Sequence, residues 1–197
     1  MPHLPPIITH PLNPETPFYH GGKDLGFRIV DFWAWNQSHL VENRNRGVLA
    51  EFLVMQALGI KRPTRLEWDE VDLKTVDGIK IEVKSAAYIQ AWEQKNYSTI
   101  VFDIAPKRKL LPDNNYSEER VRSADFYIFC LLHHKDQETI DPLNLDQWTF
   151  YLLSAKTLNV KFKEQKTLSL AALESLGCKG LTYDCLMDTF DKMISGK

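Results

Sequence analysis

Residues 72–84, with the sequence DLKTVDGIKIEVK, decide how this chain folds. An Asp77-Gly78 pair lies between two stretches that alternate apolar and charged residues, an arrangement typical of a turn between antiparallel strands. Successive side chains of a strand point to opposite faces, so Glu82 and Lys84 are neighbours on one face. The segment therefore predicts a β-hairpin that carries a carboxylate and an ammonium group side by side.

The length of the turn decides whether Asp72 joins that face. A two-residue loop would pair residue 73 with Glu82 and would turn Asp72 to the opposite face. A three-residue loop at residues 76–78 pairs Asp72 with Glu82 instead, and its last residue is a glycine, which suits a left-handed conformation. We predict the three-residue loop, or a bulge with the same effect. If Asp72 faced away, two other acids would have to be considered: Asp69 and Glu70.

These side chains suit the chemistry of a phosphodiester. Two carboxylates beside one ammonium can hold a divalent cation and a water molecule against a phosphodiester, and Glu51 supplies a further acid upstream. The alternative interpretation is an amphipathic hairpin whose solvent face carries Lys80, Glu82 and Lys84. Residues 85–87 weigh against this alternative, because their small side chains leave room for a large group near the lysine.

The composition indicates one globular domain of nearly balanced charge. The chain has 197 residues, of which 44% are hydrophobic and 25% are charged, so it can bury a core and is not generally disordered. Its net charge is -2, so it lacks the excess of basic residues that is typical of proteins that coat DNA non-specifically. Any affinity for nucleic acid must therefore come from local basic patches.

The cysteines and the apolar segments indicate a cytoplasmic protein. Three cysteines, an odd number, are typical of a reducing compartment, and we expect no disulfide bond. The first twenty residues lack the features of a secretory signal, and no apolar stretch approaches membrane-spanning length. The sequence also lacks a CxxC zinc pair and a glycine-rich phosphate loop, which argues against a zinc site and against coupling to ATP.

Apolar periodicity and capping residues predict helices first, then strands, then helices again. The helices are expected at residues 25–35, 43–58, 169–176 and 182–194. The strands are expected at residues 65–75, 79–89, 99–104, 125–132 and 148–153. Helices on either side of a run of strands favour an α/β sandwich.

Two segments outside these elements have their own character. Six of the ten prolines lie within the first seventeen residues, so residues 1–24 are predicted to be an extended, proline-rich arm. Residues 25–197 are then a single domain. The polar segment at residues 107–123 is predicted to be a long loop with at most one short helix.

The charged residues and the element order resemble the restriction-endonuclease-like, or PD-(D/E)xK, nuclease superfamily. Its core runs from an acidic helix into a mixed sheet that is flanked by helices. Asp72 matches the first strand acid of this superfamily, and Glu82 and Lys84 match its (D/E)xK pair. Glu51 matches its helix glutamate, whereas Val71 occupies the position of a proline that is often missing.

This resemblance covers about residues 43–153 and implies a restriction-endonuclease-like three-layer α/β sandwich with a mixed central sheet of about five strands. It also implies a DNA endonuclease that hydrolyses phosphodiester bonds with Mg²⁺, or with Mn²⁺ in its place, and leaves a 5′-phosphate and a 3′-hydroxyl. The metal ligands that it implies are Asp72, Glu82, the backbone carbonyl of Val83, and Glu51, bound directly or through a water. The implied role of Lys84 is to orient or help deprotonate the attacking water and to stabilise the transition state.

Other residues near this hairpin are candidates for contact with the substrate. Lys107, Arg108 and Lys109 follow a predicted strand, where a segment can overhang the catalytic edge of the sheet. Gln90 matches, with looser spacing, a glutamine that some members of the superfamily carry after the lysine. We expect DNA as the partner, with RNA left open. By analogy we expect a homodimer, because cleavage of two strands needs two sites.

Two other functions stay open at this point. The chain can have the same fold without turnover and serve as a DNA-binding or assembly subunit, since an intact motif does not prove a metal-competent site. It can also be a small α/β interaction domain in which the charged hairpin is only surface. The sequence does not choose between duplex, branched and single-stranded DNA, or between restriction, repair and mobile-element processing.

Overall fold

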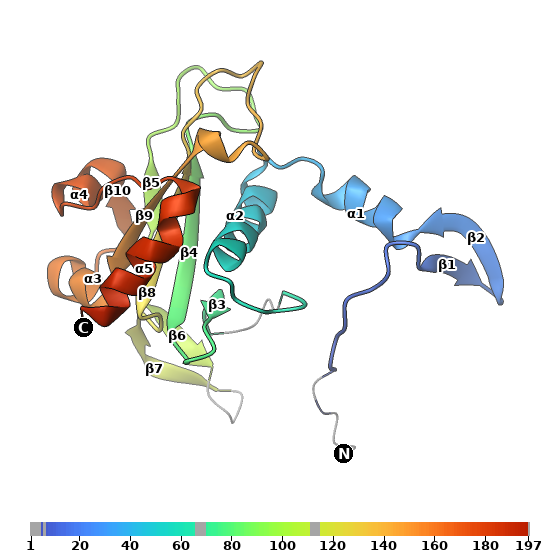
Figure 1. Ribbon diagram of the computed structural model, residues 1–197, viewed down its shortest axis with the longest axis horizontal. Coiled ribbons are helices and arrows are strands. Elements are labelled where there is room, and N and C mark those ends of the chain that lie inside the picture. Colours follow the sequence, from blue (N-terminus) through green and yellow to red (C-terminus); the bar gives the residue numbers. More distant parts are fainter. Residues whose placement is uncertain (1–4, 6, 66–69, 111–114, 197) are drawn as a thin grey trace.

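The protein is an α/β chain built around a four-stranded mixed sheet, seen here in a computed structural model (Figure 1). The structure describes residue 5 and residues 7–65, 70–110 and 115–196. Before the sheet and in its first half, the elements are β1 (Pro17–His20), β2 (Lys23–Arg28), α1 (Ile29–Gln37), α2 (Asn43–Ala57), β3 (Leu73–Lys74), β4 (Lys80–Ala87) and β5 (Val101–Asp103). The later elements are β6 (Lys107–Leu110), β7 (Tyr116–Val121), β8 (Phe126–Leu132), β9 (Trp148–Ser154), α3 (Ala155–Phe162), β10 (Thr167–Ser169), α4 (Leu170–Ser175) and α5 (Leu186–Ser195).

The sheet has the strand order β3-β4-β8-β9. Strands β4 and β8 run parallel, while β3 and β9 pair antiparallel with their neighbours. Every residue of β8 is buried, and its sequence FYIFCLL is the continuous apolar run expected of a strand that is covered on both faces. The central position of β8 therefore follows directly from its composition.

One face of the sheet is covered by α2 and α5. Leu53 and Val54 of α2 and Phe190 of α5 pack in one hydrophobic cluster with Ile81 of β4 and Phe126 of β8. The rings of Phe126 and Phe190 meet edge to face, with their centroids 5.4 Å apart. This packing anchors α2, and with it Glu51, against the strand that carries Glu82.

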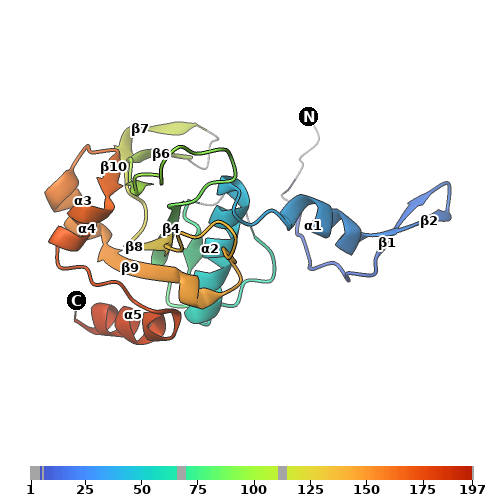
Figure 2. The same ribbon diagram turned by 90° about the horizontal axis from the view of Figure 1, so that it is seen from above.

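The opposite face is covered by α3, α4 and the small sheet formed by β5 and β10 (Figure 2). Phe102, Leu158, Leu168 and Leu173 from these four elements pack in a second cluster with Phe129 of β8. The predicted strand at residues 99–104 is thus a strand, but it pairs with β10 instead of joining the main sheet. The main sheet of the described residues therefore has four strands, not about five.

The turn between β3 and β4 is the predicted three-residue loop. Leu73 pairs with Ile81 and Lys74 with Lys80, which sets residue 72 opposite Glu82. The N–H of Gly78 donates to the carbonyl of Thr75 at 3.0 Å, and Gly78 has a φ of 83°, in the left-handed region. The predicted loop and register are both confirmed.

The N-terminal region differs from the predicted arm and helix. Strands β1 and β2 form a hairpin at a Gly21-Gly22 turn, in which both glycines have positive φ, as a two-residue hairpin turn of this type requires. Residues 25–28 therefore belong to β2, and the first helix begins at Ile29. Figures 1 and 2 show β1, β2 and α1 to one side of the main sheet, and α1 has no buried residue.

Three further predictions need correction. The segment at residues 107–123 is not simply a loop, because β6 and β7 pair antiparallel there, although residues 111–114 lie outside the described residues. The predicted strand at 65–75 is reduced to β3, and its residues 66–69, with the alternative acid Asp69, are not described. Helix α3 was not predicted, although Ser154 caps it by accepting from the N–H of Thr157 at 3.2 Å.

Two other expectations concern cysteines and membranes. The three cysteines are free thiols, as predicted, and Cys130 is buried in β8. Within the described part of the chain, no helix combines the length and apolar character needed to cross a membrane.

Gly78→Ala tests the turn. A side chain at a left-handed position costs about 1–2 kcal/mol, so we expect the free energy of unfolding to fall by about that amount. Urea unfolding followed by circular dichroism measures it. Asp77→Ala, at an exposed position of the same loop, is the control and should change stability by about 0.5 kcal/mol or less. Equal stability of Gly78→Ala and the parent would contradict the three-residue turn.

Candidate active site

The hairpin of β3 and β4 brings Asp72 beside Glu82. Asp72 immediately precedes β3, and its carboxylate oxygen Oδ2 accepts a hydrogen bond from the N–H of Val83 at 2.7 Å. The N–H and C=O of one strand residue point to the same edge, so the carbonyl of Val83 also faces the edge where Asp72 lies. Glu70, the alternative to Asp72, instead pairs with Lys80, with their charged atoms 2.5 Å apart.

Glu82 is a buried carboxylate that two ammonium groups share. Its side chain is only 9% exposed, and its oxygen Oε1 accepts from Nζ of Lys84 at 2.6 Å and from Nζ of Lys107 at 3.0 Å. The side chain of Lys84 is 18% exposed, whereas that of Lys107 is 62% exposed. One lysine is thus packed into the site, and the other reaches it from the solvent side.

The two carboxylates differ in charge state because their surroundings differ. Burial, and next the negative charge of Glu82, raise the pKa of Asp72 to about 6, although Lys84 and the N–H of Val83 oppose this rise. Burial would also raise the pKa of Glu82, but Lys84 and Lys107 outweigh that effect and lower it. Glu82 is therefore the ionised member of the pair, and Asp72 is the member that accepts a proton first.

Glu51 approaches Asp72 from α2. Both carboxylate oxygens of Glu51 accept hydrogen bonds from Arg65, from Nε at 2.6 Å and from Nη2 at 2.9 Å. Nη1 of Arg62 donates to the backbone carbonyl of Asp72 at 2.7 Å. The charge of Glu51 contributes to the raised pKa of Asp72, so the two acids interact, but Glu51 is paired with an arginine of its own.

Asp72 lies between two cavities. One, of about 320 Å³, has Glu51 and Arg65 in its wall together with apolar side chains of α2. The other, of about 450 Å³, is bordered by Asp72 and Glu82 on one side. The remaining wall of this second cavity includes basic residues from the β6–β7 region: Lys107, Arg108, Lys109 and Arg122. The wall of this cavity therefore combines four basic residues with three acidic ones, Asp72, Glu82 and Glu70.

Gln90 occupies a different environment. Its Oε1 accepts from Nη1 of Arg46 at 3.3 Å, and its Nε2 donates to the carbonyl of Ala87 at 2.7 Å. Arg46 is buried at the start of α2, and burial lowers its pKa to about 10. Gln90 thus joins the end of β4 to α2, and its predicted contact with substrate stays a prediction.

Two features of the site were not foreseen. Lys107 was predicted to contact substrate, but not to hydrogen-bond Glu82. Arg65 was not predicted as the partner of Glu51. Both pairs join residues that are far apart in the sequence, 25 positions for Lys107 and Glu82 and 14 for Arg65 and Glu51, so no local spacing signals them.

A comparison with known families identifies the family of the chain. The sequence model of the bacteriophage T4 endonuclease IV family matches residues 30–172, more than half of the chain and all of the site described above. The chain belongs to this family. It is therefore an endonuclease, a phosphodiester hydrolase, and the family implies DNA as its substrate. No curated protein matches the chain.

The donor atoms of the hairpin suit a hard divalent cation. Asp72, Glu82 and the carbonyl of Val83 offer the oxygen ligands that Mg²⁺ prefers. Burial is the main cause of the raised pKa of Asp72, and the negative charge of Glu82, which a cation would offset, is the second. As they stand, no three histidine, cysteine, aspartate or glutamate side chains of the described residues are grouped closely enough to hold a metal ion. A cation at Glu82 would have to displace an ammonium group, and Lys107 is the more exposed of the two.

The charge state of Asp72 predicts a pH dependence of stability. A carboxyl with a folded pKa of about 6 binds its proton more tightly than the unfolded chain does, for which the value is about 3.9. Stability therefore falls as pH rises from about 4 to 6 and stays lower above this window. Asp72→Asn removes the ionisable group and therefore this loss of stability at higher pH. It retains a side-chain oxygen that can accept the hydrogen bond from the N–H of Val83.

We expect Asp72→Asn to be more stable than the parent at pH 8 in EDTA, by roughly 1–3 kcal/mol, and the gain to vanish below about pH 4. Urea unfolding at several pH values measures the difference. Asp77→Asn, an exposed change in the same hairpin, serves as the control and should show no such pH-dependent gain. A gain for Asp72→Asn that is equal at pH 4 and pH 8 would contradict the raised pKa.

Proposed function

We propose that this endonuclease cleaves DNA with Mg²⁺ through a site of the restriction-endonuclease-like, PD-(D/E)xK type. Asp72, Glu82 and Lys84 form its core, and Glu51 is the fourth member. The observation that carries the proposal is the hairpin register, because it sets Asp72 opposite Glu82 while the ammonium of Lys84 lies 2.6 Å from Glu82. Chance surface charges on a hairpin would not be buried in this way.

The architecture supports the same proposal. A mixed sheet with a parallel central pair, β4 and β8, carries α2 and α5 on one face and α3 and α4 on the other. Helix α2, which carries Glu51, precedes the hairpin in the chain and packs on β4, as the resemblance to the superfamily implies. We therefore assign the restriction-endonuclease-like three-layer sandwich to this chain as part of the proposal.

The proposed metal ligands are Asp72, Glu82 and the carbonyl of Val83, with Glu51 bound directly or through a water. When bound, Mg²⁺, or Mn²⁺ in its place, would supply a Lewis acid that withdraws charge from the phosphate. Asp72 must be ionised for this role, and its pKa of about 6 means that it is largely ionised at neutral pH. The N–H of Val83 holds the Asp72 carboxylate in place through one oxygen.

Among the side chains of this protein, Lys84 has the main role in stabilising the transition state in this proposal. It extends from a strand in the middle of the fold, and its side chain is mostly buried. An ammonium group in such a place can donate hydrogen bonds to the attacking water and to the phosphate, and it stabilises the negative charge that develops in the transition state. The fixed position lowers the reorganisation that this stabilisation needs.

Lys107 is proposed to act on the substrate instead. Its side chain is mostly exposed and lies on β6, at the mouth of the cavity that holds both carboxylates. When DNA enters, a phosphate can replace Glu82 as the partner of this ammonium. Arg108 and Lys109 border the same cavity and would add to the attraction for the DNA backbone.

Substitution of Lys84 tests the proposed catalysis. We expect the parent to nick and linearise plasmid DNA in Mg²⁺ or Mn²⁺ and to lose this activity in EDTA. Lys84→Ala should lower the rate constant of cleavage by about 10²-fold or more, because it removes a positioned donor. Single-turnover cleavage of a labelled DNA measures the rate constant.

Lys80→Ala is the matched control, since Lys80 lies on the same strand but pairs with Glu70. It should cleave at a rate within about threefold of the parent. Cleavage by Lys84→Ala at the rate of Lys80→Ala, or undiminished cleavage in EDTA, would overturn the proposal.

Metal titration tests the place of Glu51. By isothermal titration calorimetry with Mn²⁺, Glu51→Gln should bind about 10-fold or more weakly, and Asp72→Ala should lose measurable binding. Glu93→Gln, at an exposed loop position, is the control and should bind as the parent does. Parent-like affinity in Glu51→Gln would remove Glu51 from the ligand set while leaving Asp72 and Glu82 in it.

A further inference from the structure

The hairpin of β6 and β7 carries an arrangement of charge that its own stability does not explain. In the antiparallel register Arg108 lies directly opposite Arg120, and both residues are exposed. Directly opposed residues on an antiparallel pair have their Cβ atoms about 4.5–5.5 Å apart, so like charges there repel each other. An acidic residue opposite either arginine would have stabilised the pair instead.

The surroundings do not neutralise this pair. Glu118 and Glu119 precede Arg120 in β7, yet neither arginine forms an ion pair with any residue in the part of the chain that the structure describes. The hairpin is a two-stranded sheet of its own, and such hairpins are only marginally stable. A repulsive pair in a marginal element indicates a function that an anion would complete.

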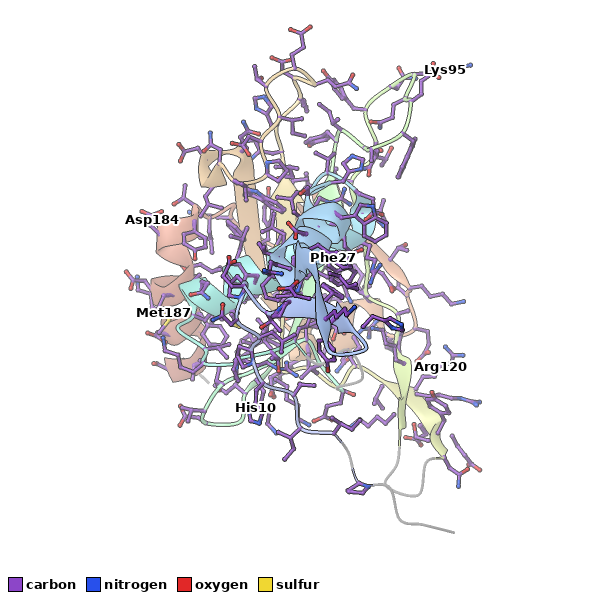
Figure 3. All side chains as sticks on the ribbon, turned by 90° about the vertical axis from the view of Figure 1, so that its right-hand side faces the viewer. His10, Phe27, Lys95, Arg120, Asp184 and Met187 are labelled. Atoms are coloured by element: carbon purple, nitrogen blue, oxygen red, sulfur yellow. The ribbon has the colours of Figure 1, made fainter. Side chains whose placement is uncertain are left out.

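The position of the hairpin identifies that anion. Arg108 follows Lys107, whose ammonium reaches Glu82, and both residues border the cavity beside the carboxylates. Because adjacent side chains of a strand point to opposite faces, Arg108 and Arg120 lie on the face of the hairpin opposite to Lys107. Residues 107–122 include five basic and three acidic residues, whereas the whole chain has a net charge of -2. Figure 3 shows Arg120 at the edge of the molecule, on the side away from Asp184 and Met187.

We propose that Arg108 and Arg120 together bind a phosphate of the DNA backbone where the DNA extends beyond the cavity in which the phosphodiester is cut. Guanidinium groups suit this task, because each is planar, always charged and able to donate two parallel hydrogen bonds to phosphate oxygens. A phosphate between the two guanidinium groups would offset their mutual repulsion. The repulsion is thus present only in the free protein, and its relief favours the complex with DNA. This inference rests on the proposed function for the location of the cut, but the binding itself needs no catalysis.

The alternative is that the two arginines are ordinary surface charges. An ordinary surface pair would contribute to DNA binding only as part of the general positive field, and any two basic residues removed elsewhere would have a similar effect. The pair Lys179 and Lys192 offers this comparison, because both are exposed. Lys192 lies on α5, across the molecule from β6 and β7 (Figure 2), and Lys179 lies in the segment between α4 and α5. Equal changes of net charge can thus be compared at the two places.

The experiment compares Arg108→Gln/Arg120→Gln with Lys179→Gln/Lys192→Gln. DNA binding is measured by fluorescence anisotropy in Ca²⁺ at several salt concentrations, and cleavage is measured in Mg²⁺. For the arginine variant we expect about 10-fold weaker binding. The slope of log affinity against log salt concentration should be smaller in magnitude by about 1–2. Its KM should rise while kcat stays within about threefold of the parent, because the pair holds DNA without touching the reacting atoms.

DNA with single neutral methylphosphonate linkages locates the contact. In the parent, one linkage near the cut should weaken binding strongly, and the arginine variant should be insensitive to that linkage. Equal effects of the arginine and lysine variants, or no position at which the variant loses sensitivity, would overturn the inference. In either case metal-dependent cleavage by the parent, abolished by Lys84→Ala, would leave the proposed function intact.

Melting temperature separates binding from folding. Removal of a repulsive pair should leave the melting temperature of the arginine variant equal to that of the parent or slightly higher. A clear fall would show that the two arginines stabilise the hairpin, and it would count against the inference. Arg120→Lys, which retains the charge but not the planar group, should recover the salt dependence but only part of the affinity.

Discussion

The pairing of β3 with β4 is the constraint on which the site depends. Because side chains alternate with a period of two, a shift of one residue would turn Asp72 away from Glu82. The three-residue loop at Gly78 sets the register, and the hydrogen bond from Val83 to Asp72 continues the pairing past the short end of β3. A loop on the surface thereby determines which charges meet at the buried edge of the sheet.

The site also depends on an uneven distribution of charge between two acids. Glu82 has both Lys84 and Lys107 as partners, whereas Asp72, among the residues that the structure describes, has a backbone N–H and the more distant field of the same lysines. A buried pair of carboxylates can exist without a cation only if one of them is compensated and the other can take up a proton. Both conditions are met here, so the protein can fold with its acids together before any metal or DNA arrives.

The parts of the structure that follow local rules could be predicted from sequence. The apolar run of β8, the helical spacing of α2 and the glycine at position 78 each indicate structure over a few residues, and these predictions are confirmed. Predictions failed where pairing partners lie far apart, as for β5, which pairs with β10 after more than sixty intervening residues. The polar hairpin of β6 and β7 has no apolar face, so alternation gave no sign of it.

The same contrast applies to the site. The alternation of side chains along a strand is enough to place Glu82 and Lys84 on one face. The three-residue loop, chosen over a two-residue loop, then places Asp72 on that face as well. No rule of spacing could have paired Lys107 with Glu82, or Arg65 with Glu51, because those contacts need the tertiary fold. Gln90 shows the converse, since a residue chosen for its spacing after Lys84 lies instead against the buried Arg46.

The parallel pairing of β4 with β8 has a consequence for the order of folding. At the start of these strands the N–H of Lys80 donates to Asp125, which is 45 positions away in the chain, so this pairing needs the closure of a long loop. A β-hairpin closes in about 1–10 μs, whereas pairings of distant strands form later and more slowly. We therefore expect the two acids to meet early during folding, in a hairpin still open to water, and the buried environment that shifts their ionisation to arrive only when β8 docks.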